Sequence, residues 1–86
     1  MINFKQRQLA DEFFKKVRQR FPEIELIDIS SSPEDPRELW INITSPPDEY
    51  REFELMDMVS EISADILSDY GYPILVIPGG KQLMAA

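Results

Sequence analysis

Residues 39–78 read LWINITSPPDEYREFELMDMVSEISADILSDYGYPILVIP, and their pattern changes twice. Over residues 39–44, aliphatic side chains alternate with those of Trp40, Asn42 and Thr44, which is typical of a strand with one buried face. Apolar residues then recur three and four apart, as on one side of a helix, before a short apolar run between prolines. A strand–helix–strand unit returns its second strand parallel to the first. We therefore expect strands at 38–44 and 73–78, joined by a helix at 48–70.

Turn chemistry supports both ends of this helix. Prolines suit a first turn, and Ser45 or Asp48 can accept hydrogen bonds from the free amides there. Gly71 is placed to end the helix in the left-handed conformation. The expected core-facing stripe comprises Leu55, Met56, Val59, Ile62, Ile66, Leu67 and Tyr70.

A second helix is predicted at about 4–20. Asn3 followed by Gln6 has the spacing of a capping box that opens a helix, and Pro22 stops the pattern. Apolar residues recur every four positions between these points and form a stripe broad enough to face a core. The stripe comprises Leu9, Phe13, Val17 and Phe21, widened by Ala10 and Phe14.

The segment EIELIDI, residues 23–29, is expected to be a strand, but its apolar residues fall on both faces. Either a bulge shifts the phase of the strand or both faces are partly covered. The loop 30–37, marked by serines and prolines, connects it to the next strand and makes the pair antiparallel.

The expected architecture is a single α+β domain over residues 1–86, in the order α-β-β-α-β. A three-stranded sheet with two helices packed on one face is the simplest way to bury both helical stripes. A frayed tail is expected at 79–86.

The 86 residues include no cysteine and no histidine. Disulfides and thiolate chemistry are thereby excluded, and the commonest general base and transition-metal ligand are missing. Gly79 and Gly80 precede Lys81, but only five residues follow, too few for the helix N-terminus that binds a phosphate. We expect no enzyme, no cofactor, and no catalytic or metal-binding residue.

No stretch approaches the roughly 20 apolar residues of a membrane helix, and the N-terminal sequence lacks the pattern of a signal peptide. These observations favour a cytoplasmic protein without membrane contact.

The net charge of −7 is unevenly distributed. Residues 1–21 carry six basic and two acidic side chains, whereas residues 22–86 carry three basic and fourteen acidic ones. The excess of basic side chains in residues 1–21 suggests an alternative role as a nucleic-acid accessory protein, although the pI near 4.4 argues against it. The candidate basic patch comprises Lys15, Lys16, Arg18 and Arg20.

The predicted helix 48–70 carries a row of acidic residues. Such a row can bind a basic protein partner or a hard cation, or it can simply be the solvated side of the helix. A basic partner fits better than a cation, because one helix side without loop ligands is a poor cation cage. The row comprises Glu54, Asp57, Glu61 and Asp65.

The second strand places Trp40 and Asn42 opposite its core-facing residues. The last strand is apolar at every position, which normally signals cover on both faces. Helices on one face alone would leave the other open, and exposed apolar patches with a tryptophan mark protein interfaces. We predict a non-catalytic interaction module, most simply a homodimer, with an interface of Trp40, Asn42, Ile74 and Val76. The alternative is internal cover by the N-terminal residues, the tail or the loop 30–37.

The second half of the chain resembles a group of short bacterial proteins, many of them cyanobacterial. In that group a tryptophan-bearing strand leads into Pro-Asp/Glu-Glu, an acidic helix, a DIL..YGY motif and a short apolar strand. Trp40, the run Pro47–Glu49 and the segment DILSDYGY at 65–72 carry the resemblance. It covers roughly residues 40–78 and implies this fold unit without an activity.

The order of elements is also similar to type II KH domains and ribosome-binding factors. The chain departs from both, because it lacks a G-x-x-G between paired helices and its helix at 48–70 is continuous.

Overall fold

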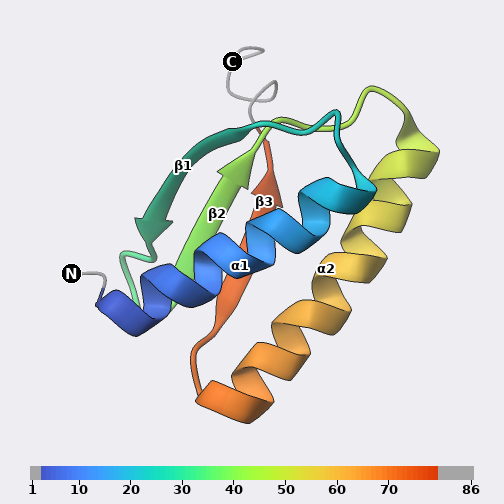
Figure 1. The fold of residues 1–86 in the computed structure, drawn as a ribbon. Coiled ribbons are helices and arrows are strands. Elements are labelled where there is room, and N and C mark those ends of the chain that lie inside the picture. The colour runs from blue at the N-terminus through green and yellow to red at the C-terminus, as the bar shows by residue number, and fades with distance from the viewer. Residues whose placement is uncertain (1–2, 80–86) are drawn as a thin grey trace.

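The computed structural model describes residues 3–79 and shows a small compact α+β domain in the expected order (Figure 1). The elements are α1 (Phe4–Arg20), β1 (Leu26–Ser31), β2 (Leu39–Ile43), α2 (Glu49–Tyr70) and β3 (Ile74–Pro78). The sheet order is β1-β2-β3, with β1 antiparallel and β3 parallel to β2. Both helices lie on one face of the sheet, as predicted.

The capping box at the start of α1 is confirmed. The Asn3 side chain accepts from the Gln6 amide at 2.8 Å, and the Gln6 side chain accepts from the Asn3 amide at 3.0 Å. Gln6 is buried and also donates through Nε2 to the Arg37 carbonyl at 2.9 Å. One side chain therefore both caps α1 and fixes it to the loop between β1 and β2.

Both ends of α2 follow the predicted turn chemistry. Asp48 is the N-cap, and its carboxylate accepts from the Tyr50 amide at 2.9 Å. Gly71 ends the helix with φ of +77°, and its amide donates to the Leu67 carbonyl. A residue without Cβ suits this left-handed position.

β1 begins later than the expected residue 23. Before it, the chain turns back from α1, where the Ile24 amide donates to the Phe21 carbonyl at 3.2 Å, and the Ile24 side chain is buried. The pairing with β2 then shifts between Leu26 and Asp28, so the bulge is confirmed. Leu26 and Ile27 are both exposed at the bulge, which explains why apolar residues fall on both faces of this strand.

The core lies between the sheet and the two helices. Its central residues from β2 and β3 are fully or almost fully buried, and both helices contribute a stripe to it. The largest buried side chains are those of Phe13, Phe21, Ile24, Leu39, Ile41, Ile43, Leu55 and Ile74. Within residues 3–79, neither helix is long and apolar enough to cross a membrane.

Candidate interaction surfaces

The face of the sheet turned away from the helices carries Trp40 and Asn42, as predicted. Their neighbours across the parallel ladder are Leu75 and Ile77. Trp40, Asn42 and Ile77 are half-buried, and Leu75 is exposed. We call the surface formed by Trp40, Asn42, Leu75 and Ile77 the open face.

The prediction that Ile74 and Val76 belong to this surface is wrong. Both side chains are buried in the core, beside Leu39 and Ile41 of β2. Alternate residues of a strand point to opposite faces, and β3 has apolar residues throughout, so its sequence gives no sign of which set faces the helices. The parallel register with β2 determines which residues of β3 face the helices. It places Leu75 and Ile77 on the same face as Trp40 and Asn42.

The open face is polar toward β1 and apolar toward β3. Asn42 donates through Nδ2 to Asp28 at 2.6 Å and to Ser30 at 3.2 Å, which links the two strands. Trp40 donates its indole N–H to Glu38 at 2.6 Å. These bonds satisfy the polar groups, so the surface left for a partner to cover is the apolar half beside β3.

A groove of about 380 Å³ runs along the edge of β3, between that strand and α2. Leu75 and Ile77 reach it from the open face, whereas Met56 and Leu67 line it from α2. The sequence pattern assigned Met56 and Leu67 to the core, together with Tyr70. That assignment is wrong, because all three are exposed. α2 is therefore apolar over a wider arc than the core requires.

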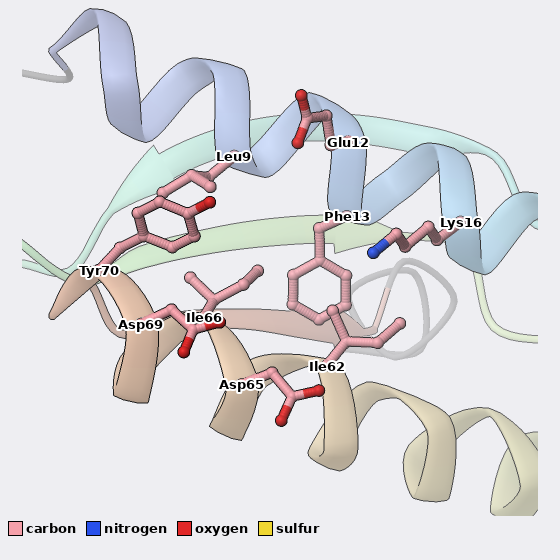
Figure 2. A pocket seen from close by; sticks show the side chains of 9 residues that line it. All are labelled: Leu9, Glu12, Phe13, Lys16, Ile62, Asp65, Ile66, Asp69 and Tyr70. Atoms are coloured by element: carbon pink, nitrogen blue, oxygen red, sulfur yellow. The ribbon is translucent and has the colours of Figure 1, made fainter.

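The predicted basic patch is divided among three surfaces. Lys15 and Arg18 line a depression with Phe14 on the side of α1 away from α2. Lys16 lines the groove between the helices, where Figure 2 shows its side chain beside Phe13. A nucleic-acid backbone could not contact these residues as one stripe.

Arg20, the fourth residue of that patch, lies with acidic residues instead. It lines a depression that α2 completes with Glu54, Asp57 and Glu61. Asp65, the last residue of the predicted acidic row, lines the groove between the helices. All four carboxylates are exposed, so the acidic row is a solvated helix side with a basic end of α1 beside it.

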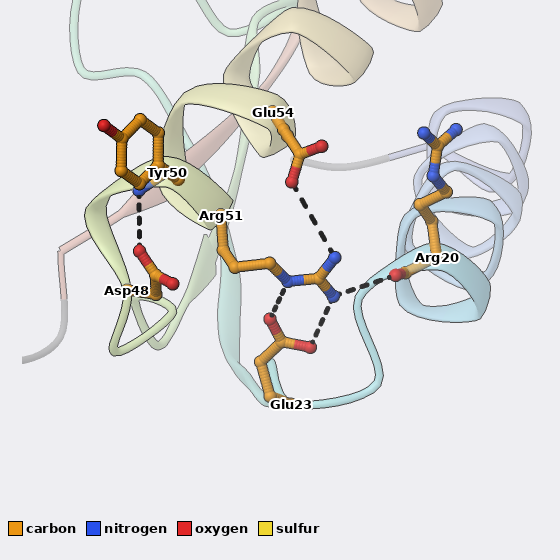
Figure 3. A network of polar contacts seen from close by, with 6 residues as sticks. All are labelled: Arg20, Glu23, Asp48, Tyr50, Arg51 and Glu54. Atoms are coloured by element: carbon orange, nitrogen blue, oxygen red, sulfur yellow. Dashed lines mark hydrogen bonds and ion pairs between the residues drawn. The ribbon is translucent and has the colours of Figure 1, made fainter.

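The densest polar network joins the N-terminal end of α2 to the end of α1, as Figure 3 shows. Arg51 donates to both oxygens of Glu23 at 2.9 and 3.0 Å, and to the Arg20 carbonyl at 3.1 Å. Its guanidinium also lies 4.4 Å from the centroid of the Phe21 ring. The hydrogen bonds from Arg51 lower the pKa of Glu23, and the same bonds raise the pKa of Arg51. This bidentate pair, together with the bond to the Arg20 carbonyl, fixes the start of α2 against the end of α1.

Residues 3–79 hold no cluster of three or more acidic side chains arranged to bind a metal ion. Among the same residues, no buried side-chain polar atom lacks a hydrogen-bond partner. No protein-family model matches the chain, and comparisons with curated proteins and with solved structures find no significant match.

Proposed function

We propose that this protein is a small non-catalytic interaction module that self-associates through the open face. The observation that carries the proposal is the position of Trp40, on the side of the sheet over which no other part of residues 3–79 forms a helical layer, and next to the exposed Leu75. Tryptophan is enriched among the residues that contribute most to binding, and burying an adjacent apolar row favours association. A homodimer is the simplest such assembly, because one patch can face its own copy across a two-fold axis.

Neither alternative role gains support from the arrangement of charges. A basic stripe for nucleic acid would need its residues on one surface, and these residues are divided. A basic protein partner would meet Arg20 beside the acidic side of α2. The apolar half of the open face carries no charge of either sign, so like charges do not oppose each other when two copies meet there.

The single tryptophan reports directly on this surface. We expect Trp40 emission to shift to the blue and to be less quenched by acrylamide as concentration rises from about 1 to 500 µM, a range suited to moderate interfaces. Leu75→Lys should remove this concentration dependence. Ile27→Lys, at an exposed apolar residue on the bulge of β1, is the matched control and should preserve it. Emission that does not change over the whole range would refute self-association through the open face.

A further inference from the structure

α2 carries a second apolar strip that the core does not use. Phe53 is 65% exposed, Met56 36% and Leu67 50%. Ser60 and Ala64 are exposed between them, and the groove beside β3 places both on the same side of the helix as Met56 and Leu67. We call Phe53, Met56, Ser60, Ala64 and Leu67 the α2 seam.

The spacing of the α2 seam reads the same in both directions, with steps of three, four, four and three residues. If a second α2 lies antiparallel, with its Ser60 opposite Ser60, the larger side chains fall opposite suitable partners. Phe53 then faces Leu67 of the second copy, and Met56 faces Ala64 of the second copy. Small residues near the middle allow the two helices to approach closely, and helix packing matches protrusions with gaps in this way.

The seam also differs in charge from the rest of α2. The chain carries a net charge of −7, yet none of the five seam residues is charged. The carboxylates that a basic partner would bind lie on another side of α2, where Glu54, Asp57 and Glu61 line the depression with Arg20. An uncharged strip needs a partner that is equally apolar and equally spaced, which a second copy supplies, although the net charge of −7 on each copy opposes its approach.

We propose that the α2 seam is a homotypic contact in which two copies pack α2 against α2, antiparallel, about a two-fold axis at Ser60. This contact is centred on α2, whereas the proposed open-face association is centred on Trp40, and the two surfaces adjoin at the groove beside β3. If both contacts form, each copy has two partners, and assembly proceeds beyond a dimer.

The area of the contact sets its expected strength. A helix pair over the fifteen residues 53–67 is about 21 Å long and about 10 Å wide, which covers on the order of 200–400 Å² on each copy. Specific stable interfaces bury about 800 Å² per partner, so the seam contact belongs to the weak, reversible class. Covalent trapping and work at high concentration therefore suit it best.

The register can be tested by exchanging charges across the seam. The background for every variant is Trp40→Ser, so that association through the open face does not contribute. Ala64→Arg alone and Met56→Glu alone should each weaken self-association at least tenfold in sedimentation measurements. The double variant should recover most of the loss, because the guanidinium at position 64 then meets the carboxylate at position 56 of the second copy. Both sites are exposed, so circular dichroism should show unchanged folding.

Disulfide trapping tests the two-fold axis, and the absence of natural cysteines keeps the readout clear. Ser60→Cys should form an interchain disulfide at least tenfold faster than Glu61→Cys, which places the thiol on the adjacent, solvated side of α2. Equal rates for the two variants would overturn the proposal, as would a double variant that fails to recover association. A wild-type protein whose Trp40 emission never changes while the seam variants behave as expected would refute only the open-face association.

Discussion

Adjacent residues of β3 should respond in opposite ways to truncation, which tests which side of the sheet faces a partner. The Ile74 side chain is fully buried in the core, whereas Leu75 is 37% exposed on the open face. Ile74→Ala removes buried methyl groups and leaves a cavity, which costs roughly 3 kcal/mol of unfolding free energy. For a domain of this size, that loss lowers the melting temperature by about 12–24 °C. Leu75→Ala should cost about 1 kcal/mol or less, because much of that side chain is already in water.

Urea unfolding followed by circular dichroism measures both losses, and Trp40 emission at high concentration measures association. We expect Ile74→Ala to lose stability, and Leu75→Ala to stay folded but associate more weakly. If Ile74→Ala proves too unstable, Ile74→Val should still cost about 1 kcal/mol. Equal losses at the two positions, or a larger loss at Leu75, would show that the assignment of the two faces is wrong.

Three further predictions concern the pair of Arg51 and Glu23, the end of α2 at Gly71, and the basic residues of α1. Because Arg51 lowers the pKa of Glu23, the stabilisation from this pair is present above the ordinary carboxyl pKa and is lost as pH falls through the lowered value. Arg51→Met should therefore be less stable than the wild type at pH 7, and the difference should shrink below about pH 4 in urea unfolding; a constant difference would contradict this. Gly71→Ala should cost about 1 kcal/mol through the left-handed backbone alone, since nothing lies within 4 Å of the added Cβ, and an unchanged melting temperature would argue against that conformation. Titration with single-stranded and duplex oligonucleotides at about 20 mM salt should show no saturable binding; binding that weakens steeply with salt and on changing Lys15 and Arg18 to Glu would support a nucleic-acid role.

Much of the fold could be predicted from local sequence signals. The predicted range of α1, 4–20, agrees with the structure because the capping box and a four-residue apolar repeat specify it together. Asp48 and Gly71 set the ends of α2 by equally local chemistry. The order of elements then left only one simple way to place two helices on a three-stranded sheet.

The interaction surfaces could not be predicted in the same way, because they depend on tertiary register. β3 is apolar at each of Ile74 to Ile77, so only its pairing with β2 reveals that Leu75 shares a face with Trp40. Met56 and Leu67 fit the apolar stripe of α2, yet both are exposed beside β3. The helix sequence alone does not show where the edge of the sheet lies. Residues 80–86, most of the predicted tail, lie outside the described residues, whereas the Gly79 amide still donates to the Ile43 carbonyl.

Self-association is tested most directly by sedimentation equilibrium of the unmodified protein from about 1 to 500 µM, which spans the affinities expected for interfaces of modest size. We predict an average mass that starts at the 10.0 kDa of one chain and rises to at least twice that value with concentration. A mass that stays at 10.0 kDa up to the highest concentration would contradict the open-face association.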